Sequence, residues 1–118
     1  MPNERRNNKR LKFGYYMRVI DNNSQELLGN LSDISPRGFR LDSQKALTIN
    51  QDYTLRLEQT SMVSDKPYIV FDARAMWGQR DPIIPNEYNE GFQIINISQY
   101  EEEIFQSVME KYGVPENQ

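Results

Sequence analysis

The stretch from Lys12 to Leu31 reads KFGYYMRVIDNNSQELLGNL and determines much of what we expect of the fold. Between Lys12 and Ile20, apolar side chains recur at every second position, which is the period of a β-strand with one buried face. Residues 21–24, Asp-Asn-Asn-Ser, have the composition of a turn, and residues 26–31 continue as a second strand. The stretch therefore predicts an antiparallel β-hairpin.

Four further strand candidates follow this hairpin. A polar loop, SDISPRG at residues 32–38, precedes the first of them, and the four lie at residues 39–42, 53–58, 68–78 and 91–97. Six closely spaced strands predict a mostly β fold built on a small antiparallel six-stranded barrel, because closing a sheet removes its exposed edges.

A C-terminal helix is expected over residues 98–113, where it would plug or flank the barrel. Ser98 and Glu101 match a capping box, in which each side chain satisfies a free backbone N–H of the other. Apolar residues then recur about every four positions, and Gly113 with Pro115 provides the stop.

The length and composition exclude several classes of protein. A chain of 118 residues has the size of one domain. It contains no Cys and no His, which excludes disulfides, thiol nucleophiles, Cys-ligated zinc and imidazole bases. We expect no cofactor, no metal and no enzymatic activity, since no pair of carboxylates is placed by its spacing for acid–base chemistry. Without an apolar run of roughly 18 residues or a signal-like segment, the chain is expected to be cytoplasmic.

Charge is distributed unevenly along the chain. Residues 1–18 contain six basic residues and one acidic residue, a net charge of +5, whereas the remaining residues contain 8 basic and 16 acidic residues, a net charge of −8. Residues 1–11 also lack apolar periodicity, so we expect them to form a flexible basic arm on an acidic barrel of residues 12–97. Such an arm either binds an anion or serves only as a solubilising tail.

Two short motifs, one on each side of the first hairpin, indicate a function. Arg6 and Arg10 form an RxxxR pattern in the arm, and Asp33, Ser35 and Gly38 form a DxSxxG pattern. With the residue frequencies of this chain, chance would produce RxxxR about 0.7 times and DxSxxG about 0.02 times. The second motif therefore carries most of the information.

In this order and at this separation, the two motifs resemble those of the PilZ domain family. The resemblance extends to the segments Ala75-Met76-Trp77 and Glu90-Gly91-Phe92, which are similar to late strands of that family, and it covers nearly the whole chain. It implies a single PilZ domain over residues 1–118 and a bacterial receptor for the second messenger cyclic di-GMP. It also implies control of motility, biofilm formation, exopolysaccharide or virulence through a partner protein that the residues do not identify.

The arm arginines have the chemistry that this implied ligand requires. An Arg side chain stays protonated and presents a planar fork of donors, so Arg6 and Arg10 can each pair with a guanine edge or a phosphate. Arg5 adds a third positive charge against a ligand with two phosphates.

The second motif supplies complementary groups. The Asp33 carboxylate can accept the guanine N1 and N2 protons, and Ser35 can bind a base edge or a phosphate. Gly38 allows either a turn with positive φ or a close approach of the ligand. Alternatively, Asp33 and Ser35 serve only the turn of their loop.

Three further residues are candidates for the same site. Arg37 and Arg40 either reinforce it or remain solvated, as exposed Arg side chains commonly do. Trp77 either packs in the core or rim of the barrel or stacks on the ligand.

We expect ligand binding to order the arm on the barrel and to create a surface for the partner, in a monomer or a weak homodimer. Whether one ligand or a stacked pair binds is left open by the sequence. Two alternative functions remain. One is a single-stranded nucleic-acid binder, which the acidic barrel disfavours. The other is a PilZ-like protein that binds no ligand and acts only as a protein-interaction adaptor.

Overall fold

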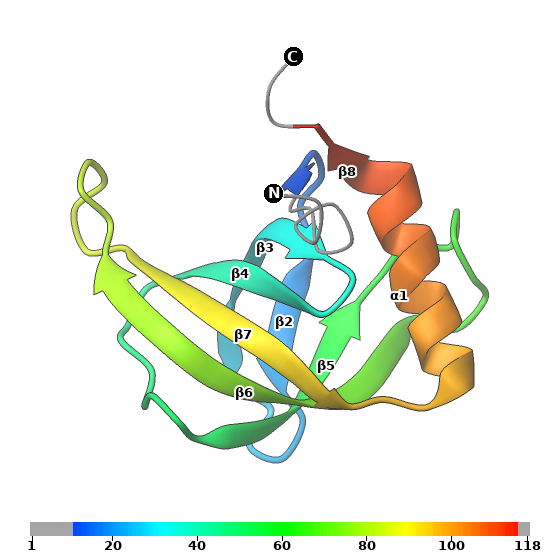
Figure 1. Cartoon of the computed structure of the whole chain (residues 1–118), viewed down its shortest axis with the longest axis horizontal. Coiled ribbons are helices and arrows are strands. Elements are labelled where there is room, and N and C mark those ends of the chain that lie inside the picture. Colours follow the sequence, from blue (N-terminus) through cyan, green and yellow to red (C-terminus); the bar gives the residue numbers. More distant parts are fainter. Residues whose placement is uncertain (1–10, 116–118) are drawn as a thin grey trace, which may run out of the picture.

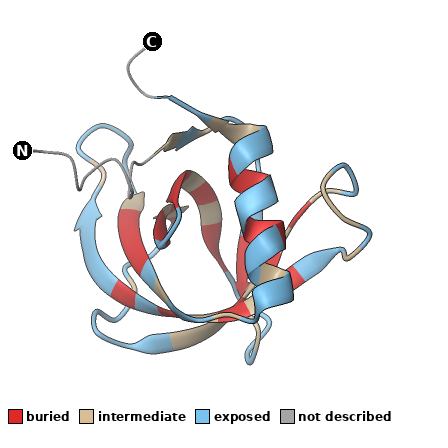
Figure 2. Ribbon diagram, turned by 45° about the vertical axis from the view of Figure 1, so that its right-hand side comes forward, coloured by how far each residue is buried: buried red, intermediate tan, exposed pale blue. Residues whose placement is uncertain are grey.

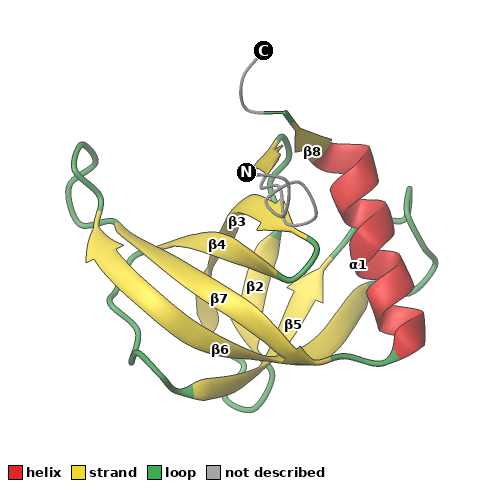
Figure 3. Ribbon diagram, viewed as in Figure 1, coloured by secondary structure: helices red, strands yellow, loops and turns green. Residues whose placement is uncertain are grey.

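The structure is a computed structural model that describes residues 11–115. Six strands form a closed antiparallel barrel (Figures 1 and 3). Their hydrogen-bonded order is β2-β5-β6-β7-β4-β3, and the ring closes because β2 also pairs with β3. The strands are β2 (Arg18–Asp21), β3 (Leu27–Ser35), β4 (Gly38–Ser43), β5 (Asp52–Glu58), β6 (Tyr68–Arg80) and β7 (Tyr88–Asn96). The mostly β, six-stranded barrel with a C-terminal helix that the sequence predicts is confirmed.

Two short strands lie outside the ring and bring the two ends of the described chain together. β1 (Leu11–Phe13) pairs with β3, and β8 (Gly113–Val114) pairs with the other edge of β1. The predicted arm, residues 1–11, lies outside the described residues except for Leu11, which already belongs to β1.

The prediction of one strand from Lys12 to Ile20 is wrong, because the chain leaves the sheet between Phe13 and Arg18. Gly14 causes the break. Its N–H donates to the Tyr112 carbonyl at the end of the helix (2.8 Å), and a Cβ on Gly14 would lie 3.0 Å from the Val114 side chain. The alternation of side chains therefore continues through a segment that belongs to no strand, in which Gly14 bonds to the end of the helix and the Met17 carbonyl accepts the Leu31 N–H of β3 at 2.9 Å.

The predicted loop at residues 32–38 is also wrong. Residues 32–35 continue β3, and only Pro36 and Arg37 form the turn to β4. Asp33 has β1 on one side, opposite Lys12, and β4 on the other, opposite Arg40. Pairing along both edges overrides the low strand propensity of a polar segment. β4, β6 and β7 are also longer than the strands predicted at residues 39–42, 68–78 and 91–97.

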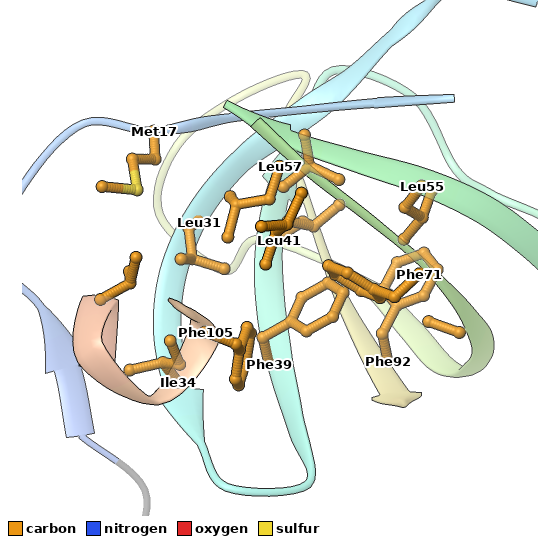
Figure 4. Packing of buried hydrophobic residues seen from close by; sticks show 14 of the residues in the cluster. Met17, Leu31, Ile34, Phe39, Leu41, Leu55, Leu57, Phe71, Phe92 and Phe105 are labelled. Carbon is orange, nitrogen blue, oxygen red and sulfur yellow. The ribbon is translucent and has the colours of Figure 1, made fainter. Parts of the chain in front are cut away.

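Inward side chains from all six barrel strands and one helix fill the core (Figure 4). Phe39 stacks on Phe92 with ring centroids 5.3 Å apart, and Phe71 meets Phe105 of the helix edge-on at 6.0 Å. Aromatic pairs in these geometries contribute about 0.5–1.5 kcal/mol beyond the burial of their surface. The barrel is thus a packed interior closed by the helix rather than an open channel.

The helix α1 (Gln99–Tyr112) covers one opening of the barrel and exposes its opposite face (Figure 2). Its buried residues are Ile104, Phe105, Val108 and Met109. Half of the predicted capping box is present: Ser98 Oγ accepts the Glu101 N–H at 3.2 Å, whereas the Glu101 carboxylate accepts from the Ser98 hydroxyl at 3.0 Å and not from the Ser98 N–H. The Glu101 carboxylate also accepts the Val70 N–H at 3.0 Å, which attaches the helix to the part of β6 that precedes its pairing with β7. Among the described residues, no helix is long and apolar enough to cross a membrane.

Candidate functional site

The second motif lies at the tip of the β3–β4 hairpin. Asp33 and Ser35 lie at the C-terminal end of β3, and Gly38 is the first residue of β4. The two-residue turn Pro36-Arg37 joins the two strands. Ser35 is directly opposite Gly38 in the strand register, and its hydroxyl donates to the Gly38 carbonyl at 3.2 Å. The structure therefore brings the three motif residues together, and the Ser35 hydroxyl also holds the hairpin, as the alternative interpretation proposed.

Asp33 is a buried acidic residue, with 5% of its surface exposed. Arg40 lies beside it, with 3.7 Å between Arg40 Nε and the carboxylate, and the same Nε donates to the Ser32 hydroxyl at 2.9 Å. The guanidinium thus forms an ion pair with this buried carboxylate and is held in place by the neighbouring Ser32 hydroxyl. Arg40 thus adjoins the motif, as the sequence suggested.

Gly38 is required by packing, and of the two roles expected for it, the turn with positive φ is wrong. No described glycine has a positive φ. A Cβ on Gly38 would lie 2.3 Å from the Phe92 carbonyl oxygen, so the close approach that glycine permits here is that of β4 to β7.

A shallow groove of about 230 Å³ adjoins the hairpin tip on the outside of the barrel. Trp77 forms part of it with 40% of its surface exposed, so Trp77 belongs to the surface rather than to the core. The indole lies across Gly91, where a Cβ would come within 2.1 Å of the indole nitrogen. The residues that line the groove are Ser35, Arg37, Gly38, Met76, Trp77, Gly91, Phe92 and Gln93.

Sequence reasoning did not identify Met76, Gly91 and Gln93 as part of this groove. Gln93 is opposite Gly38 on the neighbouring strand, and Gly91 is opposite Trp77. An irregularity in the register between Ala75 and Trp77 changes which β6 residues face outward. A glycine opposite a large aromatic residue was a usable signal, but only after the two strands had been aligned.

The arm begins next to the motif. Leu11 is opposite Ile34 and Lys12 is opposite Asp33, so the first described residues run alongside the residues of the second motif. Arg5, Arg6 and Arg10 lie outside the described residues. Within residues 11–115, no group of three or more acidic side chains is placed to hold a metal ion.

Comparison with known proteins agrees with this arrangement. A family model described as the PilZ domain matches residues 4–111, which is most of the chain. The chain belongs to the PilZ domain family. The match includes both motifs and the groove, and the resemblance inferred from the sequence is confirmed. No curated protein matches the chain.

Three similar solved structures show how widely this PilZ fold is shared. The PilZ domain with c-di-GMP of YcgR from Escherichia coli has a TM-score of 0.69 at 17% identity, with 92% of this chain and 91% of that chain covered. The Bacillus subtilis inhibitor of motility (MotI/DgrA) has a TM-score of 0.67 at 11% identity, covering 87% of this chain and 49% of that one. YcgR in complex with c-di-GMP, also from Escherichia coli, has a TM-score of 0.66 at 15% identity, covering 91% and 45%. This PilZ domain therefore spans about half the length of the two longer proteins.

Proposed function

We propose that this PilZ domain is a receptor for cyclic di-GMP and that the ligand joins the N-terminal arm to the β3–β4 hairpin. The single observation that supports this best is the pairing of β1 with β3, which starts the arm beside Asp33. An extended chain spans at most about 3.6 Å per residue, so Arg6 is tethered within about 18 Å of Leu11, and Arg10 directly precedes it. Both arginines of the first motif are therefore within reach of the second.

The distribution of charge explains why the arm is needed. Residues 11–115 carry 15 acidic and 10 basic side chains, so the barrel alone does not attract a ligand with two phosphates. The missing positive charge is in the arm, as Arg5, Arg6 and Arg10. Their guanidinium groups can pair with phosphate oxygens or with guanine O6 and N7.

The groove provides the place for one base. A volume of about 230 Å³ corresponds to roughly eight water molecules, which suits a single nucleobase rather than a whole cyclic dinucleotide. The exposed indole of Trp77 offers a face for stacking. Asp33 is buried and does not line the groove, but it lies two residues before Ser35 of the groove wall, and its carboxylate supplies acceptor oxygens for the guanine N1 and N2 protons. Arg37, exposed in the turn, lies at the groove edge, where it can meet a phosphate.

Calorimetric titration with cyclic di-GMP tests this proposal. Replacement of Asp33 or Arg10 by Ala removes a charge-assisted contact and should weaken binding by about 1.5–3 kcal/mol, roughly 10- to 150-fold. The matched controls are Asp65→Ala, on an exposed loop, and Lys9→Ala, in the arm but outside the motif. Added salt should weaken binding to the wild type. Equal affinity in the wild type, Asp33→Ala and Arg10→Ala would refute the proposed site.

We further propose a regulatory rather than a catalytic role, in which the ordered arm forms part of a surface for a partner protein. A polar, basic arm gains little by docking alone, because it has few apolar side chains to bury. Ligand binding should therefore slow amide hydrogen exchange in residues 3–12. If the protein binds the ligand but amide exchange in residues 3–12 is unchanged, the arm is not ordered by the ligand. The receptor role would then stand, and the proposed ordering of the arm would be refuted.

A further inference from the structure

Glu90 is a carboxyl group buried inside one end of the barrel. It lies on β7 two residues before Phe92 and opposite Leu41 of β4, both core residues, so its side chain faces inward. Only 1% of Glu90 is exposed, and its Oε1 atom has no hydrogen-bond partner among the described residues. Buried carboxyl groups are normally paired with a charge or saturated by hydrogen bonds.

Gly78 provides the space that this carboxyl occupies. Gly78 is opposite Glu90 on β6, and a Cβ on Gly78 would lie 2.3 Å from Glu90 Oε1. Protonation alone does not satisfy the free oxygen, because a carboxylic acid O–H still needs an acceptor. Burial raises the pKa of Glu90, and the nearby N–H of Leu47 offsets this only in part.

The carboxyl borders a cavity of about 290 Å³ at this end of the barrel. Much of the wall is apolar, formed by Leu47 and Ile49 from the segment after β4 and by the ring of Tyr88 on β7. The volume corresponds to roughly ten water molecules, which suits a small ligand. The cavity is also separate from the groove at Trp77, since Gly78 and Glu90 face the barrel interior while Trp77 and Gly91 face outward.

The cation in the cavity wall does not neutralise Glu90. The Arg80 guanidinium lies over the Tyr88 ring, 5.6 Å from its centroid, and donates to the Tyr88 hydroxyl at 3.4 Å. No ion pair joins Arg80 to Glu90 within the described part of the chain. A metal ion does not suit the cavity either, because Glu90 is the one acidic side chain in its wall and metal ions take several oxygen ligands.

We propose that the cavity beside Glu90 is a second ligand site, which takes a small organic cation with a primary ammonium group on a short apolar stem. The ammonium donates to the free carboxylate oxygen in a charge-assisted hydrogen bond, and the stem packs on Leu47, Ile49 and the Tyr88 ring. Because Glu90 is almost completely covered, binding requires residues 44–49, which belong to no strand, to shift outward, while Asn50 and Gln51 stay bonded to the Ala75 backbone of β6. This site does not depend on the binding of cyclic di-GMP.

Nuclear magnetic resonance titration of the full chain tests this proposal, with n-butylammonium chloride as the probe and butan-1-ol and sodium chloride as controls. We expect saturable shifts of the amide signals of Leu47, Gly78 and Glu90 with butylammonium alone. The isosteric change Glu90→Gln should weaken binding at least tenfold. Glu87→Gln, which removes the same charge from a residue outside the cavity wall, should bind like the wild type.

Three results would overturn the second site. They are equal shifts with butanol and butylammonium, equal affinity of Glu90→Gln and Glu87→Gln, or no saturable shift at the cavity residues. The comparison of the two probes uses the wild-type protein, so it decides the question even if a variant does not fold.

Discussion

Two adjacent residue pairs of the β6–β7 hairpin use glycine in the same way but produce opposite environments. On the outer face, the Trp77 indole lies on Gly91; on the inner face, the Glu90 carboxyl lies against Gly78. In each pair the missing Cβ leaves room for a large side chain from the opposite strand. The outer pair yields an exposed aromatic surface, whereas the inner pair yields a carboxyl hidden from water. A glycine opposite a large side chain can therefore produce either an exposed aromatic surface or a buried carboxyl group. Which of the two results depends on the face of the sheet on which the pair lies.

Gly78→Ala should have the largest effect on stability, because the side chain that the new methyl would displace is a buried carboxyl, which has fewer ways to move than an exposed side chain. The added methyl would meet the Glu90 carboxyl at 2.3 Å inside the barrel. We expect the free energy of unfolding to fall by about 2–3 kcal/mol, as in other overpacked interiors. Urea denaturation measures this change. A variant as stable as the wild type would mean that the Glu90 carboxyl moves aside as freely as the Trp77 indole. The proposed difference between the inner and outer faces of the hairpin would then be wrong.

Glu90→Gln should have the next largest effect, and in the opposite direction. Removal of a buried charge without a full set of partners should raise the free energy of unfolding at pH 7 by about 1–2 kcal/mol. The pKa of Glu90 is raised in the folded state by burial, so the wild type loses stability as the pH rises through that value. Below the ordinary Glu pKa of 4.5, wild type and variant should therefore become equally stable.

Denaturation at pH 7 and at a pH below 4.5 measures this convergence, and Glu110→Gln on the exposed helix surface is the control. A variant that is less stable than the wild type at pH 7 would show that the Glu90 carboxylate has a partner that stabilises its charge.

Gly91→Ala should reduce stability by about 1 kcal/mol, less than Gly78→Ala does. Its methyl would come within 2.1 Å of the Trp77 indole, but the indole is exposed and can rotate away. Because Trp77 is the only Trp in the chain, its fluorescence reports this movement, and we expect emission at longer wavelength. Affinity for cyclic di-GMP should fall in parallel. Unaltered emission with full affinity would mean that the position of the indole does not depend on Gly91.

Met76→Ser should have the smallest effect. Met76 lies beside Trp77 on the outer face and is exposed, so its replacement should change the free energy of unfolding by less than about 0.5 kcal/mol. Thermal denaturation provides the measurement. A loss of more than about 1 kcal/mol would indicate that the outer face contributes to the stability of the barrel as well as to the groove.

The barrel could be predicted from the sequence because its signals are local. Alternating side chains marked most of the strands, and the capping residues Ser98 and Glu101 marked the start of the helix. The breaks in the pattern were harder to place. Gly14 leaves the sheet because of a bond to Tyr112, nearly a hundred residues away, and Asp33 lies in a strand because it has partners on both sides. Neither cause is visible in the neighbouring residues.

The residues of the candidate site also fall into two groups, those that the sequence identifies and those that only the strand pairing reveals. Asp33, Ser35 and Gly38 could be identified from a spaced motif, since such a motif is contiguous in the chain. Gly91 and Gln93 could not, because they join the groove through the register of β7 against β4 and β6. Glu90 could not be recognised as a buried group either, because its burial depends on a glycine in the opposite strand.

The pairing of β1 with β8 has a mechanical consequence. Lys12 lies opposite Val114 and Phe13 opposite Gly113, so the outer ends of these two antiparallel strands emerge at the same end of their ladder. A force that pulls the two ends of the domain apart would load these hydrogen bonds one after another, as in a zipper, rather than all together in shear. We therefore expect stretching of the domain to detach β8 from β1 first, at low force, while the closed ring stays intact.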